Sequence, residues 1–278
     1  MSSLHIRCKM VAGLLRQRAV TELLDPSFYA AIMSDRRFIA AAAIAIFSGV
    51  VRGFSGFGSA LIYVPLTAAV YDPLTAAITF VMIDFATGVS FVMGAWKKTR
   101  WSEVLPLAAA AIASAQFGTL ILQYADPTLL RWMICALVAG IVAVLASGWR
   151  YHGRPHLAVT IAVGLLAGIL GGAVQISGPP IVIYWLGSMH DVGIVRASMI
   201  SYFGLFSAGS VVTYYLHGLL TATLVALAIL LGPMHVAAMW AGGKMFHLAP
   251  PHLYRRVAYV VIVMSAIVGM PLFDRWLR

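Results

Sequence analysis

The chain has 278 residues, of which 62% are hydrophobic and 10% are charged, and its formal net charge is +10. Soluble domains carry roughly 25% charged residues, so this composition excludes an ordinary soluble protein and predicts an integral membrane protein. The positive charge does not indicate nucleic acid as a partner. Here the basic residues flank apolar runs and are typical of orientation signals in a lipid bilayer.

Residues 1–36 mix basic side chains with short apolar clusters and lack the continuous apolar core of a signal peptide. Two interpretations stay open. The segment is either an interfacial amphipathic stretch, or it lies upstream of a true start at Met33. We expect a multi-pass membrane protein with its N-terminus in the cytoplasm.

Apolar runs of about 20 residues recur from Phe38 to Phe273, and about 20 residues of α-helix cross about 30 Å of hydrocarbon. The expected fold class is therefore an all-α polytopic membrane protein. Cys8 lies in the basic segment and Cys135 in an apolar run, and neither belongs to a metal, haem or disulfide motif. No cofactor and no metal are expected.

The apolar region contains an internal repeat. Gly49-x-x-x-Gly53 followed by Ser59-Ala-Leu-Ile-Tyr63 matches Gly168-x-x-x-Gly172 followed by Gly178-Pro-Pro-Ile-Val-Ile-Tyr184, about 119 residues further on. This pattern predicts two homologous halves, 37–149 and 157–277, each with about four transmembrane helices. The first helix of each half is interrupted by glycine or proline, which in transporters points to the binding site.

The first interrupted segment cannot be one straight helix. A single rod over residues 38–71 would be about 51 Å long, which exceeds the bilayer thickness, so the segment must bend, break or re-enter. Irregular backbone at membrane depth survives only where it is buried in protein or lines a cavity.

Two ways of threading the interrupted segments stay open. If each makes one net crossing, the halves are parallel, Lys97 and Lys98 are cytoplasmic, and Arg196 is external. If each is a re-entrant hairpin, each half crosses three times and the halves are inverted. The positive-inside rule favours the parallel arrangement, although inverted repeats are common among transporters.

The first interruption has the features of an anion site. A helix that restarts after Gly56 and Gly58 exposes backbone N–H groups and a positive dipole end, and Ser59 is expected to cap it. Glycines let a ligand approach the backbone closely. Arg52 lies next to the interruption. A charged side chain at membrane depth costs free energy unless it has a partner, so Arg52 is expected to be either an anion ligand or half of an ion pair.

The second interruption offers a different set of polar groups. Pro179 suits a first helical turn, Ser177 is placed to cap, and Gln175 can donate an amide hydrogen bond beside Gly178. Two helix starts could converge on one small oxyanion. The alternative is that the glycines at four-residue spacing serve close helix packing, and we assign that role to Gly49, Gly53, Gly164, Gly168 and Gly172.

Asp84 is an acidic residue in the middle of an apolar run. It is expected either to pair with Arg52 or to relay a coupling proton or other ion. Gln116 and His235 are isolated polar residues within helices and are expected to be packing residues.

The segments "GVVRGFSGFGSALIYVPL" and "GILGGAVQISGPPIVIYWLG", together with the duplicated arrangement, resemble the TauE/SafE family of sulfite and sulfonate-related exporters. The resemblance covers about residues 37–275. It implies a permease of the bacterial inner membrane that moves a small sulfur-containing or organic anion out of the cytoplasm. Homodimer formation stays open. The positions that match the glycine-rich repeats of the family are Gly53, Gly56, Gly58, Gly172, Gly178 and Pro179.

Two alternatives to a secondary carrier stay open. One is an anion channel. The other is an intramembrane serine protease, because Gly53-Phe54-Ser55-Gly56 matches the G-x-S-G of rhomboid proteases and His235 is a candidate partner. The protease alternative leaves the second interruption unexplained, so the chain is not expected to be an enzyme.

Overall fold

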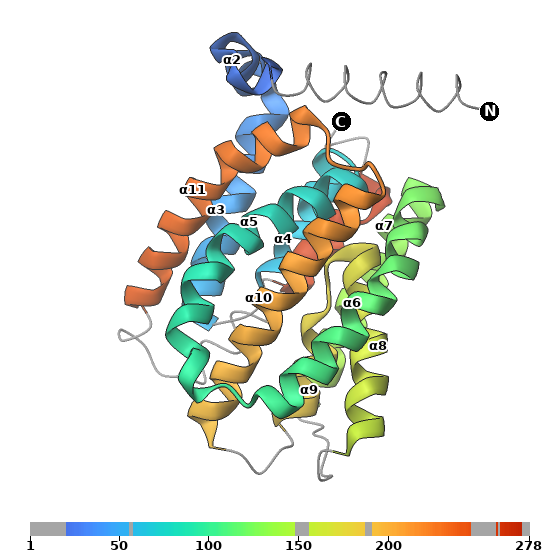
Figure 1. Cartoon of the computed structure of the whole chain (residues 1–278). Coiled ribbons are helices and arrows are strands. Elements are labelled where there is room, and N and C mark those ends of the chain that lie inside the picture. The colour runs from blue at the N-terminus through green and yellow to red at the C-terminus, as the bar shows by residue number, and fades with distance from the viewer. Residues whose placement is uncertain are drawn as a thin grey trace, which may run out of the picture.

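The computed structural model describes residues 21–55, 58–147, 156–186, 191–245, 260 and 262–273, and throughout these ranges the regular elements are helices (Figure 1). Five of the described helices are long and apolar enough to cross a membrane, or up to six if a bent pair within residues 73–98 counts as one span. The all-α polytopic fold class is therefore confirmed.

The first half of the chain begins with α2 (Pro26–Ser34), α3 (Arg36–Ser55) and α4 (Ser59–Val70). It continues with α5 (Pro73–Ala95), the short 3-10 helix η1 (Trp96–Lys98), α6 (Trp101–Tyr124) and α7 (Pro127–Ala146). An Asp-Pro pair opens α2, α5 and α7. The carboxylates of Asp25, Asp72 and Asp126 accept backbone N–H groups of the first turn at 2.8–2.9 Å, and proline at the first position costs no hydrogen bond.

The second half contains α8 (Leu157–Val174), α9 (Gly178–Leu186), α10 (Val192–Leu216) and α11 (Ala222–Met245). Residues 262–269 are again helical, and η2 (Pro271–Phe273) follows them. α2 lies outside the main bundle at one end (Figure 1), and it contains no buried residue. Whether the N-terminal segment is interfacial or precedes a start at Met33 stays a prediction, and most of it lies outside the described residues.

The helices stop and restart at both predicted interruptions. Gly58 precedes α4 in the left-handed conformation with φ of 94°, and residues 56–57 before it lie outside the described ranges. Gln175 ends α8 in the left-handed conformation with φ of 55°. Glycine adopts such a φ freely, whereas glutamine does so at some cost in strain.

Each interrupted segment turns back to the end of the bundle where it started. Asp35, just before α3, and Tyr71, just after α4, line one cavity together with Thr223 of α11. In the second half, the hydroxyl groups of Thr160 near the start of α8 and Tyr184 near the end of α9 lie 2.6 Å apart. The pairs α3–α4 and α8–α9 are therefore helical hairpins.

This geometry overturns the parallel threading. In that arrangement, Lys98 and Arg196 lie on opposite sides of the membrane, but in the structure they line the same cavity. The hydroxyls of Thr99 and Ser201 are 2.7 Å apart, and the Arg100 N–H donates to Ser198 at 3.1 Å. η1 and the start of α10 lie together at what we call the η1 end, opposite α2 (Figure 1).

The first helix of each half packs against the third long helix of the other half, α3 on α11 and α8 on α6, while α5 packs on α10. Glycines allow the close approach of α3 and α11. A Cβ atom at Gly49 would lie 2.5 Å from the His235 carbonyl oxygen, and one at Gly53 would clash with the Met239 carbonyl. From the other side, a Cβ at Gly242 would meet the Val50 carbonyl.

The α8–α6 contact repeats this packing: at each corresponding glycine, an added Cβ would again meet a backbone carbonyl oxygen of the facing helix. The corresponding clashes are Gly168 with Ala111, Gly172 with Ala115, and Gly118 with Ile169. Each contact position on α8 follows its counterpart on α3 by 119 residues, as Gly168 follows Gly49. Each contact position on α11 follows its counterpart on α6 by 124 residues, as Gly242 follows Gly118. The packing role assigned to these glycines is confirmed, and the repeated contact is what a two-fold relation between the halves would produce.

Candidate functional site

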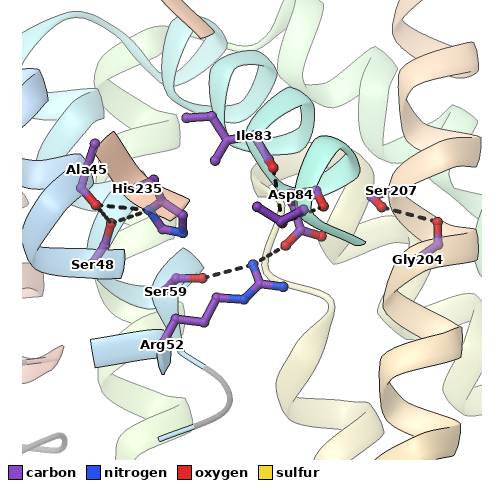
Figure 2. Close-up of polar contacts among 10 residues, drawn as sticks. Ala45, Ser48, Arg52, Ser59, Ile83, Asp84, Gly204, Ser207 and His235 are labelled. Atoms are coloured by element: carbon purple, nitrogen blue, oxygen red, sulfur yellow. Dashed lines mark hydrogen bonds and ion pairs between the residues drawn. The ribbon is translucent and has the colours of Figure 1, made fainter. Parts of the chain in front are cut away.

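Arg52 and Asp84 form an ion pair inside the bundle (Figure 2). Arg52 lies in the last turn of α3 and Asp84 in the middle of α5, and their side chains are only 19% and 12% exposed. Pairing, one of the two roles that the sequence left open for each residue, is therefore observed. Removing one partner from such a pair leaves an uncompensated charge in a poorly solvated place, which costs about 3–5 kcal/mol for fully buried pairs.

Ser59 completes this cluster at the first interruption. Its hydroxyl accepts a second contact from Arg52 Nη1 at 3.4 Å. The expectation that Ser59 caps α4 is wrong, because Gly58 occupies the cap position and no side-chain hydrogen bond caps the helix. As the first residue of α4, Ser59 is instead buried and points its hydroxyl at the guanidinium (Figure 2).

His235 lies beside this cluster and joins α11 to α3. Its Nδ1 atom is 2.9 Å from the Ala45 carbonyl oxygen and 3.4 Å from the Ser48 hydroxyl. Because a carbonyl only accepts, Nδ1 carries the proton and donates it. His235 therefore has the packing role that was expected, although its Nε2 atom is buried without a hydrogen-bond partner among the described residues. The side chain of Ser55, its proposed partner in a protease, lies outside the description.

The second interruption is held by a chain of hydrogen bonds. The Gln175 amide donates to the Tyr214 hydroxyl at 3.0 Å, and Tyr214 donates to the Gly172 carbonyl at 3.0 Å. Gln175 was expected to face an anion, and here its Nε2 is engaged by α10. Tyr214 was missed, because a tyrosine in an apolar run carries no signal that distinguishes a functional hydroxyl from a packed ring.

The start of α9 faces aromatic side chains of α10. A Cβ at Gly178 would lie 3.5 Å from the Phe203 ring, which is an ordinary contact. Ser177 and Pro179 are buried. Tyr202 stacks on Phe206 with ring centroids 5.9 Å apart, and its buried hydroxyl has no hydrogen-bond partner within the described chain. Tyr202 was also missed by the sequence analysis.

The two interruptions share a hydrophobic cluster, which contains Val174 and Ile176 beside the second and Leu61 and Ile62 after the first. Polar groups of the two interruptions do not contact each other in the described hydrogen bonds and ion pairs. The two cavities described lie elsewhere, at the α2 end and at the η1 end. Gly56 lies outside the described residues, and the backbone of Gly58 is partly exposed.

Gln116 bridges α6 and α10. Its amide donates to Thr213 at 2.9 Å and its oxygen lies 3.0 Å from Nε2 of His217. The packing role expected for Gln116 is therefore confirmed.

Comparisons with known proteins agree with the resemblance seen in the sequence. A family model described as "Sulfite exporter TauE/SafE" matches residues 41–269. The "Probable sulfite/organosulfonate exporter TauE" of Cupriavidus necator is 24% identical over 230 residues, which are 80% of this chain and 90% of that protein. No solved structure matches the chain significantly.

The matched family is one of transporters and not of enzymes, so the protease and channel alternatives are not favoured. The match covers most of the chain, including both interrupted segments. The chain belongs to the TauE/SafE sulfite exporter family.

Proposed function

We propose that this chain is a secondary carrier that exports a small anion, such as sulfite, a sulfonate or a small organic acid, across the inner membrane. The observation that carries the proposal is the position of Arg52, a nearly buried guanidinium beside the first interruption with Ser59 and the start of α4 next to it. The name of the Cupriavidus necator relative supports an oxidised sulfur anion as the substrate class.

Arg52 supplies the positive charge of the proposed anion site. A guanidinium has five N–H donors in a planar fork that fits an oxyanion, and both described contacts of Arg52 use Nη1. Gly56, Gly58 and Ser59 let the anion approach the start of α4, where the helix dipole favours negative charge.

The second interruption is proposed to complete the site from the other half. Ser177, Gly178 and Pro179 lie at the start of α9. When the two interruptions approach each other, the side-chain amide of Gln175 leaves the Tyr214 hydroxyl and donates its hydrogen bond to the anion instead. The apolar cluster that both interruptions share supports this arrangement. The halves supply different groups, so the site is asymmetric.

Asp84 is the proposed coupling residue. A carboxylate that holds Arg52 competes with an anion for the same charge, and the two negative groups repel each other. Protonation of Asp84 removes both effects, so the anion and a proton are expected to bind together.

We further propose that the two halves are inverted repeats related by an axis in the membrane plane. The matched contacts of α3 with α11 and of α8 with α6 support this. The hairpin α3–α4 opens at the α2 end and the hairpin α8–α9 at the η1 end (Figure 1), as inverted halves require. Lys97, Lys98, Arg100 and Arg196 lie at the η1 end, and Arg36 and Arg37 lie at the other end. Applied to these described residues, the positive-inside rule favours a cytoplasmic η1 end and an external α2 end, whereas the sequence analysis expected a cytoplasmic N-terminus.

The test is anion binding to the purified chain in detergent, with sulfite, sulfoacetate, thiosulfate and small carboxylates as probes. One of these anions is expected to bind, and Arg52→Gln is expected to weaken it about tenfold to a hundredfold, because hydrogen bonds to charged groups contribute about 1.5–3 kcal/mol. Arg37→Gln is the matched control, since it removes the same charge from an exposed position on the same helix.

Transport in proteoliposomes separates a carrier from a pore. Saturable uptake that is accelerated by the same anion on the opposite side is expected for a carrier. Equal binding by the Arg52 and Arg37 variants, or flux without counterflow, would contradict the proposal.

A further inference from the structure

A cavity of about 390 Å³ lies at the η1 end between the last turns of α5 and the first turns of α10. Its walls are mostly apolar and include Phe91, Gly94 and Ile200, while Lys98 and Arg196 are the basic residues that line it. The cavity is distinct from the proposed anion site, because Lys98 and Asp84 are separated by about four turns along α5 and η1.

The two basic side chains are available for a ligand. Lys98 and Arg196 are exposed and form no ion pair with any described carboxylate. Neighbouring charges have other partners: Arg100 pairs with Glu103 at 3.1 Å, and Asp191 accepts the Gly193 N–H at 3.0 Å. The cavity therefore presents two cations above an apolar wall.

The surface around the cavity is of the kind that meets lipid. Phe91, Met93 and Trp96 are 50%, 76% and 57% exposed. Tryptophan is enriched where a bilayer meets water, so Trp96 places the basic side chains at headgroup depth and Phe91 at acyl-chain depth. Charge and polarity thus change across the cavity in the same order as along a phospholipid.

We infer that this cavity binds an anionic phospholipid. The lipid phosphate lies between Lys98 and Arg196, and one acyl chain follows Phe91 and Ile200 between α5 and α10. A free anion would gain only the charged part of this site. The apolar wall therefore favours a phospholipid over inorganic phosphate.

Gly94 provides a test that leaves the charges untouched. A Cβ atom at Gly94 would meet nothing within 4 Å, although this residue lines the cavity. The Cβ of Gly94→Leu therefore meets no clash, the rest of the side chain is expected to occupy the space meant for the acyl chain, and leucine favours the helix over glycine.

Binding is measured on the purified full chain in neutral detergent by native mass spectrometry, with dioleoylphosphatidylglycerol, dioleoylphosphatidylcholine and inorganic phosphate as probes. We expect phosphatidylglycerol to bind at least tenfold more tightly than phosphatidylcholine. The double variant Lys98→Gln, Arg196→Gln and the single variant Gly94→Leu should each lower that affinity about tenfold. Each Lys or Arg near a membrane surface strengthens binding to an anionic lipid about threefold to fivefold, so the loss of both is expected to have an effect of at least about tenfold.

Lys97→Gln, Arg37→Gln is the matched control, because it removes the same charge from exposed residues that do not line the cavity. This control should bind phosphatidylglycerol like the unmodified chain. An equal loss in the control, an unchanged affinity in Gly94→Leu, or inorganic phosphate binding as tightly as the lipid would each overturn the inference.

Discussion

Arg52 and Asp84, 32 residues apart in sequence, meet as an ion pair between the end of α3 and the middle of α5. The pair connects the first hairpin to α5, which also packs against α10 of the other half. Arg52 lies in the last turn of α3, just before the first interruption. The ion pair therefore links the first interruption to α5, and the same two charges are proposed to serve transport.

Breaking this pair from one side should destabilise the protein more than removing both charges. Asp84→Asn leaves Arg52 poorly solvated and uncompensated, and we expect a loss of about 3 kcal/mol. The double variant Arg52→Gln, Asp84→Asn should recover part of it. Thermal unfolding in detergent measures both, and additive losses would show that the two side chains do not interact.

The same Asp84 variant tests coupling. If Asp84 carries the proton, Asp84→Asn should flatten the pH dependence of anion transport in proteoliposomes. An unchanged pH profile with a lower protein yield would assign Asp84 to structure alone.

Gly53 and Gly172 should be equally intolerant of alanine. A Cβ at either position would run into a backbone carbonyl of the facing helix, Met239 or Ala115, which cannot move without the whole helix. Overpacking of this kind costs about 1–3 kcal/mol. Gly140→Ala in α7 is the control, because a Cβ there meets nothing within 4 Å. Similar melting temperatures for Gly53→Ala and Gly140→Ala would refute the close packing of α3 on α11.

Tyr214→Phe should loosen the second interruption. The variant removes the hydroxyl that accepts from Gln175 and donates to Gly172, so a buried amide and a buried carbonyl lose their partner. Such a loss costs about 1–3 kcal/mol. Tyr124→Phe, at a ring that is 77% exposed, is the control for thermal unfolding. A stability change no larger than that of the control would mean that Gln175 finds another partner.

The fold class and much of the first site could be read from the sequence. Apolar runs of membrane length and the glycine spacing follow from local chemistry, and an arginine and an aspartate in apolar runs have strong reason to pair. The threading was left open by the sequence. The positive-inside rule favoured the parallel arrangement over the inverted one, but loop charges distinguish the two sides of a membrane and not the path between them.

Contact partners of the interruptions that depend on tertiary packing could not be predicted from the sequence either. Tyr214 and Tyr202 come from α10, and nothing in their local sequence indicates that they face the interruption after α8. Ser59 was misassigned for a similar reason, because its hydroxyl had a choice between capping α4 and contacting Arg52.

The orientation proposed for the chain can be tested with single cysteines. Cys8→Ser and Cys135→Ala provide a cysteine-free background, and Ser34→Cys and Lys97→Cys place one exposed thiol at each end of the bundle. Because Lys98, Arg100 and Arg196 lie with Lys97 at the η1 end, the positive-inside rule predicts that Lys97→Cys is protected from a membrane-impermeant maleimide in intact cells, while Ser34→Cys is labelled. Both thiols should react after the membrane is permeabilised, which controls for accessibility. Labelling of Lys97→Cys alone in intact cells would place the N-terminus in the cytoplasm, and labelling of both would contradict the opposite placement of α2 and η1.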